Sequence, residues 1–312
     1  MGTVLLAAPR GYCAGVERAV DAVDRALDRH GGPVYVRKQI VHNLHVVRDL
    51  ERKGAVFVDE LTEVPEGAVV VLSAHGSAPT VHDDAGRRRL DVIDATCPLV
   101  TKVHLEARRF ADDDRTILLI GHQGHEEVEG TSGQAPDRTI LVQSVAEAER
   151  VEVPDPSRLS YLTQTTLSVD ETNEIVAVLR SRFPEIQGPP REDICYATQN
   201  RQDAIKEVAG RSDVVLVIGS RNSSNSNRLA EVSRERGTPA YLVDDETEVD
   251  PTWLDGADVV GLTSGASAPE WLVDRMVGWL AERGFDRVEQ ALITEEHVRF
   301  ALPAGVRATT TS

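Results

Sequence analysis

The sequence contains few cysteines and fewer basic than acidic residues, and both features exclude classes of protein. Only three of its 312 residues are cysteines, and none has the Cys-x-x-Cys or Cys–His spacing of a zinc finger. Lysine and arginine number 34 against 51 aspartates and glutamates, which gives a net charge of −17. This acidity argues against a nucleic-acid partner, because lysine and arginine drive contact with phosphates.

Long apolar stretches are also missing. No segment approaches the ~20 continuous apolar residues that cross a bilayer, and the N-terminus lacks the basic start and apolar run of a signal peptide. With 41% hydrophobic and 27% charged residues, the chain has an ordinary globular composition. We therefore expect a cytoplasmic protein with no membrane partner. In that reducing compartment, an odd number of separated cysteines indicates reactive or metal-binding thiols rather than disulfides.

The three cysteines share one position in the local pattern. Cys13, Cys97 and Cys195 each stand directly before a run compatible with an amphipathic helix, although the third run is weaker. A thiol at a helix N-terminus meets the positive end of the backbone dipole, which favours thiolate, metal ligation or a bound anion. Position alone fits three unrelated buried thiols better, because free cysteine is among the most buried residue types.

Short β-rich runs alternate with helical patterns along the chain. The runs lie at residues 4–8, 34–36, 69–72, 117–120, 159–162, 214–218 and 259–262. The alternation predicts an α/β fold with mostly parallel sheets, and several runs are continuous, as in strands buried on both faces. The cysteine separations, 97 − 13 = 84 and 195 − 97 = 98, imply three α/β units of similar length. The predicted segments are an N-terminal strand (1–12), lobes at 13–96, 97–194 and 195–285, and a C-terminal tail (286–312).

Polar loops of small residues follow several of these strands, where open α/β sheets bind ligands. The run of serine and asparagine at 222–227 suits a phosphate better than a simple N-cap, which needs only one such residue. Ser267 begins a capping-box pattern and is a cap, a ligand contact or both. Ser168 begins the same pattern, and there we predict a plain cap. The hydroxyls at 163–166 reflect either strand propensity or the wall of a polar site.

Histidines also gather after strand-like segments. They are His42, His75, His122 and His125. Such histidines suggest donors for an anionic ligand, or metal ligands. Glu126 and Glu127 follow directly and could supply a proton, although glutamates at a helix start also favour the dipole without any function.

With these motifs in view, the chain resembles the 4-hydroxy-3-methylbut-2-enyl diphosphate reductase (IspH/LytB) family over nearly its whole length. The motifs that carry the resemblance are Pro9-Arg-Gly-Tyr-Cys-Ala-Gly-Val16, Val41-His-Asn43, Ser73-Ala-His-Gly76, Asp94-Ala-Thr-Cys-Pro-Leu-Val-Thr-Lys-Val-His104, Gly121-His-Gln-Gly-His125, Thr163-Gln-Thr-Thr-Leu-Ser168, Asp193-Ile-Cys-Tyr-Ala-Thr198, Asn222-Ser-Ser-Asn-Ser-Asn227 and Gly265-Ala-Ser-Ala-Pro269.

The resemblance implies three similar lobes in a pseudo-threefold arrangement around a central 4Fe–4S cluster. Cys13, Cys97 and Cys195 would be its ligands, which leaves one iron open to the allylic hydroxyl of the substrate. The residues expected around the diphosphate are His42, His75, His125, Ser223, Ser224, Asn225 and Ser267.

The implied reaction is reductive dehydroxylation of 4-hydroxy-3-methylbut-2-enyl diphosphate to isopentenyl and dimethylallyl diphosphates, the last step of the methylerythritol phosphate route to isoprenoids. Glu127 would supply the proton, with Thr165 near the hydroxyl and His125 beside the acid. The family usually has proline before that glutamate, whereas this chain has Glu126. That places a second carboxylate beside the proposed acid and makes Glu126 the alternative proton donor.

The implied reaction also needs an external electron donor of the ferredoxin or flavodoxin type. Since such donors are acidic, Arg87, Arg88 and Arg89 could form a docking patch, although a solvated helix face is the interpretation we favour. Two other functions remain as alternatives: a zinc hydrolase that cleaves a phosphate ester, and a non-catalytic iron–sulfur sensor. Neither accounts for the diphosphate-type loops as well as the reductase does.

Overall fold

The computed structural model describes residues 2–307, and these residues fold as two compact α/β units. The first unit contains the chain up to Glu17, then His42–Asp49 and Tyr196–Arg299. The second unit contains Arg18–Val41, Leu50–Cys195 and the chain from Phe300. Within the described residues there are three sheets, and every strand pair in them is parallel. The predicted α/β class with mostly parallel sheets is confirmed.

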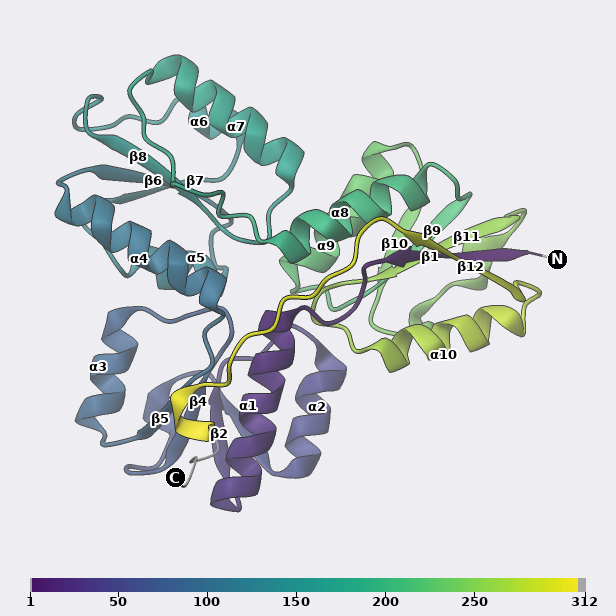
Figure 1. Cartoon of the computed structure of the whole chain (residues 1–312), viewed down its shortest axis with the longest axis horizontal. Helices are drawn as coiled ribbons and strands as arrows, with labels where there is room; N and C mark the ends of the chain where they lie inside the picture. Colours follow the sequence, from purple (N-terminus) through teal and green to yellow (C-terminus); the bar gives the residue numbers. More distant parts are fainter. Residues whose placement is uncertain (1, 308–312) are drawn as a thin grey trace. The chain divides into compact units, whose positions relative to one another are not determined.

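The first unit is built on a five-stranded sheet in the order β10-β9-β11-β1-β12 (Figure 1). Its strands are β1 (Thr3–Ala8), β9 (Val214–Ile218), β10 (Ala240–Val243), β11 (Val259–Ser264) and β12 (Arg287–Leu292). Successive side chains of a strand point to opposite faces. Val4 and Leu6 therefore enter the core on one face and Leu5 and Ala7 the core on the other. The N-terminal strand and the first part of the predicted C-terminal tail thus lie side by side in this sheet.

The second unit holds two smaller sheets, in the orders β3-β2-β4-β5 and β7-β6-β8. The strands of the four-stranded sheet are β2 (Val34–Arg37), β3 (Ala55–Val58), β4 (Val69–Leu72) and β5 (Asp91–Asp94). Those of the three-stranded sheet are β6 (Thr116–Ile120), β7 (Thr139–Val142) and β8 (Leu159–Thr163). β6 and β8 are buried along their whole length.

Helices connect the strands, as parallel sheets require. They are α1 (Ala14–His30), α2 (Leu44–Lys53), α3 (Pro79–Arg87), α4 (Pro98–Asp112), α5 (Glu126–Ser132), α6 (Val145–Ala148), α7 (Val169–Arg182), α8 (Tyr196–Ala209), α9 (Ser224–Glu235) and α10 (Glu270–Ala281). Among the described residues, no helix is both long enough and apolar enough to cross a bilayer.

All seven predicted strands are present, and each helix predicted after a cysteine begins at the residue that directly follows that cysteine. Within residues 2–307 the structure also contains five strands that the sequence patterns did not reveal, namely β3, β5, β7, β10 and β12. Each of the five is an edge strand of its sheet. In each of the five at most half of the residues are buried, so their apolar pattern is weaker.

The two capping-box patterns have different outcomes. Ser168 is the N-cap of α7, because its hydroxyl accepts a hydrogen bond from the Glu171 amide (3.3 Å). Ser267 does not cap α10, whose N-cap residue is Pro269. Its hydroxyl donates instead to the main-chain carbonyl of His42 (2.8 Å). The capping-box pattern at Ser267 was therefore misleading, because a loop of the same unit supplies a better acceptor.

The three consecutive arginines lie at and just beyond the end of α3. Arg87 forms an ion pair with Asp84, and Arg89 lies 3.7 Å from a carboxylate oxygen of Glu66. The side chains of Arg87 and Arg89 are more than two thirds exposed, whereas Arg88 donates to the Val64 carbonyl (2.5 Å). This is the arrangement of a solvated helix end with local ion pairs.

Candidate active site

Each cysteine amide is anchored to a loop that follows a strand. In all three cases the acceptor is the carbonyl of the second residue beyond the strand, after β11, β4 and β8 respectively. The bonds run from Cys13 to Ala266 (3.2 Å), from Cys97 to Ala74 (2.9 Å) and from Cys195 to Thr165 (3.0 Å). The sequence predicted a repeated helix-start position, and the structure adds this repeated main-chain anchor. All three thiols are partly buried.

Two of these loops also bind a polar side chain from the start of a helix. The amide of Thr165 donates to Glu127 Oε2 (2.8 Å), and the amide of Ala266 donates to Asn225 Oδ1 (2.8 Å). Glu127 and Asn225 are each the second residue of their helix, α5 and α9. The same arrangement therefore occurs once in each unit. In each unit it links the loop that anchors a cysteine to a residue with a predicted role: the proposed acid Glu127 or the predicted diphosphate ligand Asn225.

Glu127 is a buried carboxyl group, with 4% of the residue exposed. Thr165, which binds it, is 5% exposed. The main-chain amide of Glu127 donates to Nδ1 of His125 (3.1 Å), so His125 is the N-cap of α5. The predicted acid and both of its predicted neighbours, Thr165 and His125, are thus joined by direct hydrogen bonds.

The protonation of His125 follows from these contacts. Since its Nδ1 accepts a hydrogen bond, a neutral ring carries its proton on Nε2. Burial is the main cause that lowers the pKa of His125, and the nearby carboxylate of Glu127 only partly opposes it. His125 is therefore a neutral ring that can donate one hydrogen bond from Nε2.

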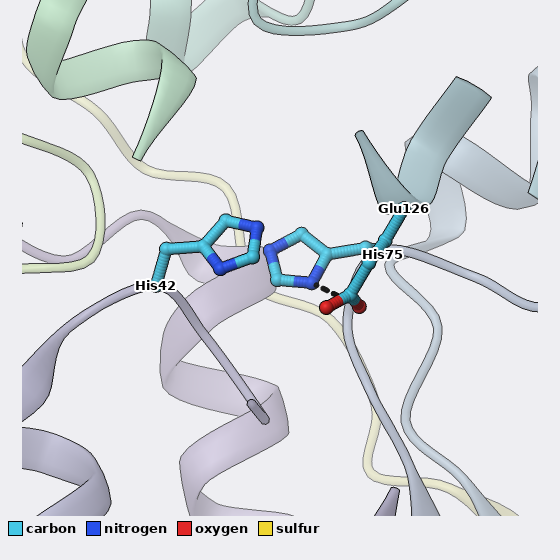
Figure 2. Close-up of side chains that lie close together, drawn as sticks. All are labelled: His42, His75 and Glu126. Carbon is cyan, nitrogen blue, oxygen red and sulfur yellow. Dashed lines mark hydrogen bonds and ion pairs between the residues drawn. The ribbon is translucent and has the colours of Figure 1, made fainter. Parts of the chain in front are cut away.

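His75 has the opposite environment, although its ring packs edge-to-face against that of His125 with centroids 5.9 Å apart. Its Nδ1 lies 3.1 Å from Oε2 of Glu126, and the Ser73 hydroxyl donates to the same oxygen (3.0 Å). Figure 2 shows the His75 ring and the Glu126 carboxylate pointing toward each other. The adjacent glutamates thus have different partners, with Glu126 on His75 and Glu127 on Thr165.

A close contact between two glycines brings the His75 loop against α5. A Cβ atom on Gly130 would lie 3.2 Å from both atoms of the Gly76 carbonyl group. Gln134 links the same two segments, because its side-chain amide donates hydrogen bonds to the carbonyls of Gly130 (2.9 Å) and Ser77 (3.2 Å). His104 of α4 packs beside both glycines, and burial lowers its pKa to about 4, so that it is neutral at pH 7.

Polar contacts also fix the surroundings of Cys97 and Cys195 in the second unit. Lys102, on the helix that follows Cys97, donates to the carbonyl of Glu192 (2.7 Å) and to Asp193 Oδ1 (3.0 Å), just before Cys195. Arg18 donates to the carbonyls of Ala95 and Thr96 (2.9 and 3.0 Å), next to Cys97. A guanidinium close to a thiol favours the thiolate form.

The Cys13 loop in the first unit is held by a fully buried arginine. Arg201 donates to the carbonyl of Gly11 (2.8 Å) and forms an ion pair with Glu296 (2.9 Å). None of the Arg201 side chain is exposed. Sequence patterns could not reveal this pair, because its partners lie 95 positions apart.

The remaining predicted residues lie in the first unit. Ser223 is the N-cap of α9 and accepts from the Ser226 amide (3.3 Å), so the serine–asparagine run does contain a cap. Ser224 is the first residue of that helix. Nδ2 of Asn222 lies 3.3 Å from Nδ1 of His42, and the Ser267 hydroxyl donates a hydrogen bond to the main-chain carbonyl of His42. The first unit therefore groups these residues with Asn225.

The predicted residues thus form two sets. The second unit joins His75, His125, Glu127 and Thr165 with the loops of Cys97 and Cys195, and the first unit carries the rest. Sequence reasoning missed the roles of Ser73, His104 and Gln134. The motif Ser73-Ala-His-Gly76 was the available signal, because it places a hydroxyl and a permissive glycine around His75. A buried carboxyl group, histidines beside it and thiols with anchored main chains are groups that an α/β enzyme can use for acid catalysis and for metal binding.

Comparison with known proteins identifies the family. The model of the LytB protein family matches residues 4–281. A 4-hydroxy-3-methylbut-2-enyl diphosphate reductase from Acidothermus cellulolyticus is 63% identical over 97% of this chain and 90% of its own length. A reductase of the same name from Streptomyces coelicolor is 59% identical over the same shares. The chain belongs to the LytB family, as its motifs predicted.

Solved structures agree with this assignment. The E-1-hydroxy-2-methyl-but-2-enyl-4-diphosphate reductase from Plasmodium falciparum matches with a TM-score of 0.95 and 37% identity, over 98% of this chain and 96% of that one. A second structure, of (E)-4-hydroxy-3-methyl-but-2-enyl diphosphate reductase, the terminal enzyme of the non-mevalonate pathway, matches with a TM-score of 0.63 and 31% identity. It covers 90% of this chain and 100% of that one.

Proposed function

We propose that this chain reduces 4-hydroxy-3-methylbut-2-enyl diphosphate to isopentenyl and dimethylallyl diphosphates in the cytoplasm. In the reaction the allylic C–O bond breaks, a C–H bond forms, and two electrons and two protons are consumed as water leaves. A donor of the ferredoxin or flavodoxin type would supply the electrons. The observation that carries the proposal is the hydrogen-bonded chain from the Cys195 amide through Thr165 to the buried carboxyl group of Glu127.

The cysteines suit a 4Fe–4S cluster with Cys13, Cys97 and Cys195 as ligands. Thiolates are the usual ligands of such clusters. Each thiol here is partly buried directly ahead of a helix, and its amide is fixed to a strand-end loop. When bound by three thiolates, the cluster supplies single electrons and an open iron for the substrate hydroxyl.

Glu127 is positioned to act as the proton donor. Its burial and its bond to the Thr165 amide fix the carboxyl group beside a cysteine loop. A positioned acid contributes about 10²–10⁴-fold in rate. Glu126 is the weaker candidate, because it is engaged with Ser73 and His75. We therefore assign the role of proton donor to Glu127.

The diphosphate would be bound by hydrogen-bond donors from both sets of residues. In the second unit these are His75 and the Nε2–H of His125. In the first unit they are His42, Ser223, Ser224, Asn225 and Ser267. Neutral hydroxyl and amide donors at the start of α9 suit phosphate oxygens, since the helix dipole adds positive potential there.

The test is anaerobic reconstitution followed by oxidation of a reduced viologen on addition of 4-hydroxy-3-methylbut-2-enyl diphosphate. We expect substrate-dependent oxidation that is lost in Cys13→Ser. Acid-labile sulfide and colour report the cluster independently of turnover. A protein with a full cluster and no turnover would be a sensor, and one that binds zinc without sulfide would be a hydrolase.

A paired comparison tests the acid. Glu127→Gln should lower turnover by about 10²-fold or more while the iron content is kept. Glu126→Gln should lower kcat far less. The reverse result would make Glu126 the donor.

A further inference from the structure

Glu126 contacts two side chains through one carboxylate oxygen, and the proposed reaction does not use it. It is the first residue of α5, and its side chain is 16% exposed. Its Oε2 accepts a hydrogen bond from the Ser73 hydroxyl (3.0 Å) and lies 3.1 Å from Nδ1 of His75. The His75 side chain is 12% exposed. Figure 2 shows this pair with its hydrogen bond. A partly buried carboxylate on an imidazole nitrogen favours the charged ring.

The electrostatics of both partners support a charged pair. Burial by itself lowers the pKa of His75, but the hydrogen bond and the charge of Glu126 outweigh burial, and the pKa is raised overall. Burial by itself raises the pKa of Glu126, but the bond and charge of His75, with the Ser73 hydroxyl, lower it overall. The raised pKa of His75 and the lowered pKa of Glu126 both favour an imidazolium–carboxylate pair.

The other groups that face His75 do not replace Glu126. His125 packs against the ring but is neutral. The Glu127 carboxylate also favours the charged form of His75, though less than Glu126 does, and one of its oxygens is bonded to the Thr165 amide. The direct bond to the ring comes from Glu126 alone among these groups.

We propose that Glu126 is a positioning residue that orients the His75 ring and favours the form with both ring nitrogens protonated, so that Nε2–H binds the substrate diphosphate. With Nδ1 bonded to Glu126, any bond from the ring to an anion must come from Nε2. A neutral ring in this orientation would present a lone pair there and repel phosphate. The inference rests on the proposed function and adds a determinant of substrate affinity to it.

Two variants remove the carboxylate without disturbing the helix start. Glu126→Gln keeps the shape of the side chain. Glu126→Pro is compatible with the backbone, because proline is tolerated at the first helical position. The preceding residue, His125, already has the extended conformation that proline requires (φ −81°, ψ 135°). Glu129→Gln is the matched control, since Glu129 lies exposed on the same helix.

The primary measurement is inorganic pyrophosphate binding to the anaerobic holoenzyme by calorimetry, from about pH 6 to about pH 9. We expect the wild type and Glu129→Gln to keep their affinity to higher pH than either Glu126 variant. At the alkaline end both Glu126 variants should bind about tenfold more weakly, a change of ~1.4 kcal/mol. The difference should narrow as the pH falls. In turnover assays the loss should fall on KM, with kcat changed by less than about twofold.

A double-mutant cycle with His75→Gln separates positioning from a general structural effect. If Glu126 acts through His75, adding Glu126→Gln to His75→Gln should change the pH profile no further. Superimposed wild-type and Glu126→Gln profiles would overturn the proposal. So would a loss of equal size at every pH, or tighter pyrophosphate binding once the carboxylate is gone.

The two hypotheses fail separately. If the wild type does not turn over 4-hydroxy-3-methylbut-2-enyl diphosphate, the proposed function fails, and pyrophosphate binding still decides the role of Glu126. If turnover is normal but the pyrophosphate profiles coincide, only the role of Glu126 is lost.

Discussion

Replacing Gly76 with alanine tests the packing that places His75. Gly76 has φ +83°, a left-handed conformation that costs alanine about 1–2 kcal/mol. An added Cβ would also lie 2.6 Å from Cε1 of His104 and 3.0 Å from Cγ1 of Val100. Both neighbours are buried in α4, and overpacking of this kind costs about 1–3 kcal/mol. The two costs together predict a loss of ~2–5 kcal/mol.

Two other glycines of the same unit separate these costs. Gly67 also has a positive φ (+76°), but a Cβ there would meet nothing within 4 Å. Gly67→Ala should therefore lose only the conformational term, about 1–2 kcal/mol. Gly86 lies inside α3, equally open and without a positive φ. Gly86→Ala should be neutral or stabilising by up to ~1 kcal/mol, because alanine is the better helix former.

The assay is denaturant unfolding of the anaerobic holoenzyme followed by far-UV circular dichroism, with all variants under identical conditions. The informative quantity is the difference between Gly76→Ala and Gly67→Ala, because the left-handed backbone is common to both. We expect this difference to be at least ~1 kcal/mol, with an additional rise in substrate KM for Gly76→Ala only. Equal stabilities within about 0.5 kcal/mol would show that the contact with α4 does not constrain the His75 loop.

Three further predictions concern single side chains. His104 has a pKa of about 4 in the folded state and 6.5 in the unfolded state. Between these pH values the unfolded chain binds more protons than the folded one. Folding stability is therefore lost as the pH falls from 6.5 toward 4, by up to about 3 kcal/mol. Acid titrations of unfolding should show a flatter profile in that window for His104→Asn, and an unchanged one for the exposed control His30→Gln. Arg201→Met leaves the Glu296 carboxylate without its buried partner and should destabilise by about 3–5 kcal/mol, whereas the exposed Arg211→Met should stay within ~1 kcal/mol in the same urea titration. Ser168→Ala removes a helix cap and should lower the unfolding free energy by about 1 kcal/mol; no loss would mean that the cap is redundant.

The sequence was most informative where one strand or helix determines the pattern by itself. Strands buried on both faces, such as β6 and β9, show as continuous apolar runs. The edge strands β5 and β12 each bury only one residue, so their sequences resemble polar loops. The cysteines could be placed before helices for the same local reason, because helical period follows each of them within a dozen residues.

The sequence by itself determined the family, the parallel α/β class and the types of residue in the site. Only the tertiary structure decided how those residues are paired. Glu126 and Glu127 are neighbours in the chain, but successive residues of an α-helix point about 100° apart. They therefore reach partners 51 and 38 positions away, at His75 and Thr165. No local pattern contains that information, because His75 follows β4 and Thr165 follows β8, two strands that belong to different sheets.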